Sequence, residues 1–192
     1  MVDAAQKKSR PLEKFFDFPI MLKDVKRTGW ISKVKVANPE SVADHSYSMC
    51  MAGMVLSDLQ GLDTLQVVRM ILLHDLAESL TGDFAPGDIS RSQKISKENS
   101  AMAEILSHLP DSLRKEYARI WDDYVEGKSE VSRFVHRIDK LEMAMQARSY
   151  SKKGYPAQTL LQFLDSAEKT VLVSKDAVSE ILMSLKNEAG SQ

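Results

Sequence analysis

The chain has 192 residues, which fits one globular domain, and 43% of them are hydrophobic, which is enough to build a core. Its 26 Lys and Arg residues nearly balance its 27 Asp and Glu residues, which argues against nucleic-acid polymers and anionic membranes as partners and favours a small ligand. Cys50 is the only cysteine, so no disulfide forms within the chain and a reducing compartment is favoured. No signal-peptide pattern begins the sequence, and the longest apolar run, Met70–Leu73, is far too short to span a membrane. We therefore expect a cytoplasmic protein.

Apolar residues recur at helical spacing along nearly the whole chain, and no convincing alternating strand pattern appears. Residues 1–11 and 187–192 lack this spacing and are interpreted as polar tails. The intervening residues, 12–186, are predicted to form a single all-α domain, a helical bundle. The predicted helices are Leu12–Thr28, Glu40–Gln60, Leu65–Leu80, Ser92–Leu109, Asp111–Glu126, Glu130–Lys152, Ala157–Thr170 and Lys175–Lys186.

The second predicted helix has two possible starts. It begins at Asn38-Pro39-Glu40, or at Ser41 with Asp44 as its capping-box partner, and the sequence does not choose between them. Either start places His45 in the first two turns. A histidine near a helix start is more often a surface or satisfied core residue than a ligand, so His45 carries weight only together with other residues.

The third predicted helix is the most apolar, yet it holds His74, Asp75 and, one turn later, Glu78. A buried unpaired charge costs several kcal/mol in a domain that is stable by only about 5–15 kcal/mol, so these groups need compensation. A divalent cation bound jointly by residues elsewhere in the chain would provide it. His74 and Glu78 share one helix face, whereas Asp75 lies about 100° around the helix. Adjacent ligands can still converge at a helix end, and Gly82 ends this helix soon afterwards.

His45 and Asp139 are candidates to complete such a site. Periodicity alone favours a different interpretation of Asp139, an exposed carboxylate paired with a neighbouring Lys or Arg at the edge of an apolar stripe. If all four residues bind one ion, two imidazoles and two carboxylates suit manganese, cobalt, iron or magnesium, with zinc a further candidate.

Five segments together resemble the 5'-deoxynucleotidase branch of the HD-domain metal-dependent phosphohydrolases. They are Lys26–Trp30, Pro39–Ser46, His74–Glu78, Gly82–Pro86 and Asp139–Met143. The resemblance extends over about residues 12–186, and the motifs in combination are highly specific. At one position the chain departs from the bacterial members, in which a Trp directly follows the motif's Arg: here Thr28 follows Arg27, and Trp30 comes two positions later.

The resemblance implies a homodimeric enzyme that hydrolyses deoxyribonucleoside 5'-monophosphates to deoxynucleoside and phosphate with one divalent metal ion. It implies metal ligands at His45, His74, Asp75 and Asp139. It also implies that Glu78 is a catalytic carboxylate near the attacking water and the leaving oxygen, that Arg27 binds the phosphate, and that Trp30 packs on the substrate. Whether Glu78 acts as a base or as an acid stays open. Asp83, by the same resemblance, contacts the sugar beside the reacting groups and helps to exclude a 2'-hydroxyl.

Simpler interpretations stay open for several of these residues. Arg27 could complement a helix dipole, Asp83 could be an ordinary turn residue, and Trp30 could serve packing. A cluster of basic residues could shape an anionic entrance or form a solvated helix face; it comprises Arg91, Lys94 and Lys97. Alternative functions are another HD hydrolase, acting on cyclic nucleotides or guanosine tetraphosphate, and a nucleotide sensor that hydrolyses nothing.

Overall fold

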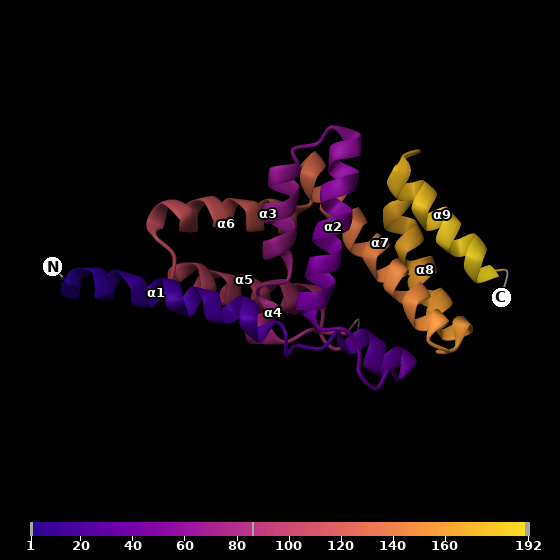
Figure 1. Ribbon diagram of the computed structural model, residues 1–192, viewed down its shortest axis with the longest axis horizontal. Helices are drawn as coiled ribbons and strands as arrows, with labels where there is room; N and C mark the ends of the chain where they lie inside the picture. Colours follow the sequence, from indigo (N-terminus) through magenta and orange to yellow (C-terminus); the bar gives the residue numbers. More distant parts are fainter. Residues whose placement is uncertain (1, 86, 191–192) are drawn as a thin grey trace.

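The computed structural model describes the backbone of residues 2–85 and 87–190 and the side chains of residues 12–85 and 87–189. Within these residues the chain is helical and has no β-strand, only an isolated bridge between Lys26 and Ser41 (Figure 1). The elements are α1 (Val2–Met21), the π-helix η1 (Trp30–Val34), α2 (Val42–Gln60), α3 (Thr64–His74), α4 (Glu78–Thr81), α5 (Arg91–Ser107), α6 (Asp111–Glu126), α7 (Glu130–Lys152), α8 (Ala157–Val171) and α9 (Ala177–Gly190). The predicted all-α fold is confirmed.

Helix α7 occupies the middle of the bundle. It packs against α2 and α3 on one side and against α8 and α9 on the other, while α5 and α6 lie at the far end of the molecule (Figure 1). Val135, Ile138 and Leu141 of α7 are completely buried, because their spacing of three presents one apolar stripe to the neighbouring helices. The candidate residues on α2, α3 and α7 therefore come from three helices that touch one another.

Several helix bounds differ from those predicted. Helix α1 begins at Val2 and ends at Met21, and α9 continues to Gly190, so residues 2–11 and 187–190 are helical rather than tails. Ala, Gln and Lys favour helix even without an apolar stripe, which periodicity does not detect. The residues after Met21 form the Lys26–Ser41 bridge and η1 instead of continuing the helix. The outermost tail residues, 1 and 191–192, and Pro86 of the fourth motif lie outside the described residues.

The two alternatives for the second helix are resolved by its cap. Ser41 is the N-cap of α2, its side chain accepts a hydrogen bond from the Asp44 N–H, and the Asp44 carboxylate accepts one from the Ser41 N–H. This capping box fixes the start of the helix and places His45 in its first turns. In the described part of the chain, no helix is long and apolar enough to cross a membrane.

The third predicted helix, Leu65–Leu80, is broken in the structure. Helix α3 ends at His74, Asp75 is its C-cap with φ −111° and ψ 10°, and the short helix α4 begins at Glu78. Turn hydrogen bonds join the two helices, from the Leu76 N–H to the Leu73 carbonyl and from the Glu78 N–H to the Asp75 carbonyl. At this break the backbone of Asp75 leaves the helical conformation. The side chains of His74 and Asp75 can therefore approach each other, although the two residues are adjacent in the sequence.

Candidate metal centre

Three helices bring polar side chains to one buried point. His45 of α2, His74 at the end of α3 and Asp139 of α7 each place a possible ligand atom within 4.8 Å of the others. Oδ2 of Asp75 lies 3.0 Å from Nε2 of His74 and 3.8 Å from Nε2 of His45. All four predicted ligands are thus brought together, and their role as ligands stays a prediction. Asp139 is buried rather than exposed, although it does pair with Lys140 at 2.9 Å.

Hydrogen bonds at Nδ1 orient both imidazoles. Nδ1 of His45 lies 2.6 Å from Oε2 of Glu142, and Nδ1 of His74 lies 2.6 Å from the Ile71 carbonyl oxygen. Each Nδ1 therefore carries the proton that it donates, and each Nε2 faces the shared point. Neither Nε2 makes a well-aligned hydrogen bond among the described residues, although carboxylate oxygens of Asp75 and Asp139 lie 3.0 Å from Nε2 of His74 and 3.5 Å from Nε2 of His45. Buried polar atoms rarely lack partners, so these residues fit a metal ion at this point.

The electrostatics of the cluster favour a positive charge there. Burial lowers the pKa of His45, as does Arg27, but the carboxylates of Asp139 and Glu142 outweigh both and raise it to about 10. Burial raises the pKa of Asp139, yet Lys140 and His45 hold it well below the usual range. Either a proton on His45 or a metal cation satisfies these carboxylates, so metal binding would compete with protons.

Glu78 lies beside this cluster at the start of α4. Its side chain is almost completely buried, with Oε1 3.5 Å from Nζ of Lys94 on α5, and its Oε2 has no hydrogen-bond partner among the described residues. Burial, followed by the charges of Asp75 and Asp83, raises the pKa of Glu78 well above its ordinary value. Burial and the two neighbouring carboxylates thus favour the protonated form of this carboxyl.

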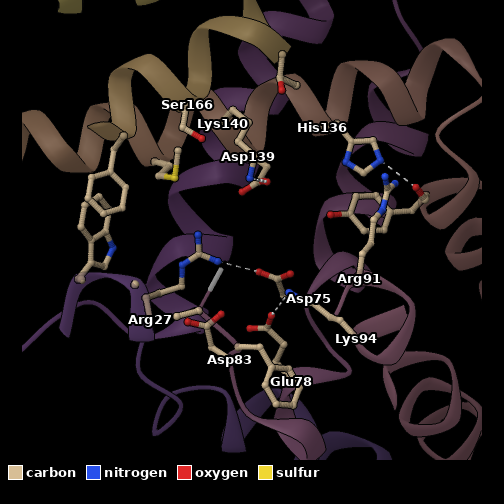
Figure 2. Close-up of a pocket in the computed structure, with 18 of the residues that line it drawn as sticks. Arg27, Asp75, Glu78, Asp83, Arg91, Lys94, His136, Asp139, Lys140 and Ser166 are labelled. Atoms are coloured by element: carbon tan, nitrogen blue, oxygen red, sulfur yellow. Dashed lines mark hydrogen bonds and ion pairs between the residues drawn. The ribbon is translucent and has the colours of Figure 1, made fainter. Parts of the chain in front are cut away.

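A cavity of about 750 Å³ opens beside the cluster (Figure 2). Arg27 lies on its wall with Nη1 3.3 Å from Oδ2 of Asp75, and Asp83 lies on the loop after Gly82. Burial lowers the pKa of Arg27, but Asp75 and Asp139 outweigh it and raise the value, so the guanidinium stays charged. Figure 2 shows Arg27, Asp75, Glu78 and Asp83 gathered on one side of the cavity, with Asp139 opposite. The space could hold a small anionic molecule.

Trp30 lies at the edge of this cavity but is almost wholly buried, at 2% exposed. Its ring stacks on Phe163 with centroids 4.2 Å apart, and its Nε1 donates a hydrogen bond to Oε1 of Glu40 at 2.8 Å. Packing thus accounts for most of its surface, and its predicted contact with substrate is untested. Of the basic cluster, Arg91 and Lys94 line the cavity, whereas Lys97 is exposed and is not part of the lining.

Sequence reasoning missed two residues that the geometry adds to the site. Glu142 follows Asp139 by three positions on α7, a spacing that places both on one helix face and could have identified it. The sequence showed Thr28 only as a departure from the bacterial motif and predicted no contact for it. Its backbone N–H donates to Oδ2 of Asp83 at 2.5 Å, and its hydroxyl lies 2.9 Å from the same oxygen.

Two histidines and two aspartates around one point of an all-helical bundle define a class of proteins with a helical metal centre. The chain belongs to the HD domain family, and the family's sequence model matches residues 21–180. The chain is 39% identical to the human 5'-deoxynucleotidase HDDC2 over 82% of its own length and 77% of that protein. It is 32% identical to the 5'-deoxynucleotidase hdd1 of Schizosaccharomyces pombe, over 81% and 80% of the two chains. The crystal structure of the PH0347 protein from Pyrococcus horikoshii OT3 superposes with a TM-score of 0.74 at 26% identity, covering 94% and 98%.

Proposed function

We propose that this chain is a metal-dependent 5'-deoxynucleotidase, a phosphoric monoester hydrolase that converts deoxyribonucleoside 5'-monophosphates to deoxynucleosides and phosphate. One observation carries the proposal: two buried imidazole Nε2 atoms without a well-aligned hydrogen bond and two carboxylates converge beside a cavity that also holds a charged arginine. The names of the relatives, which match over about four fifths of this chain, support the same activity.

His45, His74, Asp75 and Asp139 would hold one divalent cation. Two nitrogen and two oxygen donors suit manganese, cobalt, iron or magnesium, and zinc is a further candidate. A bound ion of this kind lowers the pKa of a coordinated water from 15.7 to about 7 and neutralises phosphate charge. Asp75 and Arg27 are already paired at 3.3 Å, so a phosphate that binds Arg27 also lies close to the ligand set.

Arg27 would bind the equatorial oxygens of the phosphate. A guanidinium presents two parallel N–H donors to a phosphate, and the transition state of phosphoryl transfer spreads negative charge over those oxygens. Burial in the cavity wall strengthens this interaction, because the surrounding dielectric constant is lower than that of water. The arginine thus positions the substrate and stabilises charge, and it transfers no proton.

Glu78 would serve as the proton donor. Breaking the bond between phosphorus and the 5'-oxygen leaves an alkoxide, which needs a proton to depart as a hydroxyl group. The raised pKa of Glu78 favours the form that can supply this proton. Asp83, on the same side of the cavity, would contact the sugar, and Trp30 with Phe163 would support the wall beside it.

Phosphate release tests the proposal. Protein treated with a chelator is supplied with one metal at a time and assayed on deoxyribonucleoside and ribonucleoside 5'-monophosphates. We expect metal-dependent release that favours the deoxy substrates, and loss of at least 100-fold in kcat for Glu78→Gln, the scale typical of general acids. Release from cyclic or tetraphosphate substrates alone would identify a different HD hydrolase, and tight binding without release would identify a sensor.

Assembly and location are separate parts of the proposal. The resemblance supports a homodimer, which sedimentation or light scattering of the purified protein measures directly. A cytoplasmic location is supported by Cys50, the only cysteine of the sequence, because a chain that forms no internal disulfide suits a reducing compartment. Fractionation of cells that express the tagged protein tests this location.

A further inference from the structure

Tyr124 of α6 lies in the cavity wall next to the predicted metal ligands. Its ring stacks on the ring of His136 with centroids 4.5 Å apart, and it meets the ring of His74 edge-on with centroids 5.7 Å apart. Two ring contacts of this kind restrict the orientation of the phenol. Tyr124 is therefore held against a predicted ligand without being a ligand itself.

The backbone around Tyr124 is anchored to two neighbouring helices. Nε2 of His136 on α7 lies 2.9 Å from the Tyr124 carbonyl oxygen. One turn earlier on α6, Nε1 of Trp121 donates a hydrogen bond to Oδ1 of Asn99 on α5 at 2.8 Å. None of these contacts uses the Tyr124 hydroxyl, so the ring keeps its position if the hydroxyl is removed.

The Tyr124 hydroxyl is free to bind a ligand, because no residue in the described part of the chain makes a hydrogen bond with it. Other donors of the cavity lining are already paired within the protein, Lys94 with Glu78 and Lys140 with Asp139. A cavity that holds a charged arginine attracts an anion, and an unpaired O–H group in its wall can donate to that anion.

The phenol is a donor at any pH at which the enzyme is folded and active. An ordinary tyrosine, with a pKa of about 10, is already protonated at neutral pH. Burial, followed by the charges of Asp139 and Asp75, raises the pKa of Tyr124 well above that value. The same carboxylates accept hydrogen bonds but cannot donate them, so the proton on Tyr124 is a resource that they lack.

Tyr124 and Arg27 approach the cavity from different sides. Figure 2 shows Arg27 across the cavity from His136, the residue on which Tyr124 stacks. A guanidinium that binds phosphate in a fork occupies two of its oxygens, and the transition state of phosphoryl transfer has three equatorial oxygens. A phosphate held by Arg27 therefore keeps acceptor capacity on the side where Tyr124 lies.

We propose that Tyr124 is a catalytic residue that donates a hydrogen bond to a non-bridging oxygen of the phosphoryl group and stabilises the charge that develops there in the transition state. This inference rests on the proposed function, to which it adds a second side-chain donor opposite Arg27. The hydrogen bond transfers no proton, so this role differs from that of Glu78, which would protonate the leaving oxygen. A neutral donor also adds no positive charge next to a cation site, where it would repel the cation.

The test is Tyr124→Phe, which removes the hydroxyl and keeps the ring and its contacts. We expect kcat for dAMP to fall about 10- to 100-fold, the scale of one donor to a developing charge, while KM stays within about threefold of the wild-type value. Steady-state phosphate release with Mn²⁺ measures both. A raised KM with an unchanged kcat would show that the hydroxyl serves binding alone and would overturn the inference.

A second substrate separates this role from that of a proton donor. Hydrolysis of dAMP must protonate an alkoxide, whereas p-nitrophenyl phosphate releases a phenolate that departs without a proton. Tyr124→Phe should lower kcat by a similar factor on both substrates, because both carry the same phosphoryl group. Glu78→Gln should lose much less on p-nitrophenyl phosphate than on dAMP. A loss in Tyr124→Phe that is confined to dAMP would place the hydroxyl on the leaving oxygen and contradict the proposal.

Tyr117→Phe is the matched control, because Tyr117 lies about two turns earlier on α6, packs against the core and is not part of the cavity lining. It should keep the wild-type kcat. Titration with Mn²⁺ should give equal affinities for the wild type and Tyr124→Phe, since the hydroxyl is not a predicted ligand. A loss of Mn²⁺ affinity as large as the loss of kcat would assign Tyr124 to support of the metal site and would refute the catalytic role.

Orthovanadate gives a readout that needs no turnover, because it mimics the five-coordinate transition state of phosphoryl transfer. Calorimetry with Mn²⁺-loaded protein should show weaker orthovanadate binding in Tyr124→Phe, by about the same factor as the loss in kcat, and unchanged binding in Tyr117→Phe. If Tyr124→Phe does not fold, Tyr124→Leu takes its place with the same expectations. If the wild type releases phosphate from no monoester, the proposed function fails while this measurement still tests Tyr124. Equal orthovanadate affinities in the wild type and a folded Tyr124 variant overturn the inference.

Discussion

The two histidines of the site depend on different kinds of partner. His74 is oriented by the Ile71 carbonyl of its own helix, which no side-chain substitution removes, whereas His45 is oriented by Glu142, 97 positions away. Sequence motifs predicted both histidines, Asp75 and Asp139. Glu142 was assigned no role: its spacing from Asp139 places it on the same face of α7, but its contact with His45 comes from the packing of α7 against α2.

Glu142→Ala should therefore weaken manganese binding by about 10- to 100-fold, the usual effect of losing a partner that orients a ligand. Glu142→Gln, which keeps an acceptor oxygen, should lose less. Titration of metal-free protein with Mn²⁺ measures both affinities. Glu130→Gln is the control, since this exposed residue lies at the start of the same helix. Wild-type affinity in Glu142→Ala would exclude an orienting role.

At the scale of elements, helix bounds were predicted well where local signals decide them. Helices α6 and α7 have the predicted bounds, and Gly61 and Gly82 end α2 and α4 as expected. The break at His74 was missed because no Gly or Pro marks it and apolar residues continue on both sides. The π-helix η1 was missed for a similar reason, since its packing of Trp30 against Phe163 and Tyr150 comes from distant helices.

Helices α2 and α3, which carry the two histidines, approach closely at Gly53. A Cβ at this position would collide with the Ile71 side chain and touch Val67 at 3.4 Å. Gly53→Val should separate the helices, lower the free energy of unfolding by about 1–3 kcal/mol through overpacking, and weaken Mn²⁺ binding. Denaturant unfolding and metal titration measure the two effects. As a control, Ser48→Val, at an exposed position of α2, should change the free energy of unfolding by about 0.5 kcal/mol or less. Equal effects of the two substitutions would show that the close approach of α2 and α3 at Gly53 does not limit stability.

At the scale of the whole molecule, composition and periodicity were sufficient to predict one all-α domain, but not which helices pair. The contact between α7 and the segment leading into α9 depends on Arg137, which is 7% exposed and donates to both carboxylate oxygens of Asp176 at 2.7 and 2.6 Å. Neither residue belongs to a motif, and 39 positions separate them, so only the tertiary structure identifies the pair.

This pair should make stability depend on acid pH. Its hydrogen bonds with Arg137, above all, hold the pKa of Asp176 below the ordinary value. Because the folded-state pKa is the lower one, the stabilisation is complete above the unfolded pKa of about 4 and is lost as the pH falls through the folded pKa. Asp176→Asn should lower the free energy of unfolding by about 1–2 kcal/mol at pH 7, because solvent screens this half-buried carboxylate, and its stability should depend less steeply on pH below 4. If the free energy of unfolding falls with the same slope below pH 4 in the wild type and in Asp176→Asn, groups other than Asp176 cause the acid sensitivity.

A bound metal should stabilise the whole fold, because its ligands come from α2, α3 and α7 and from the turn after α3. An ion that binds only the folded state, at 100 times its dissociation constant, adds about 2.7 kcal/mol. For a chain of this size that free energy raises the melting temperature by about 5–10 °C. Calorimetric scans of chelated protein with and without Mn²⁺ measure this shift, and His45→Ala should abolish it while Lys97→Ala, at an exposed position of α5, preserves it. The same melting temperature with and without each candidate metal would show that the four side chains bind no ion, since a ligand specific for the folded state must shift the unfolding equilibrium.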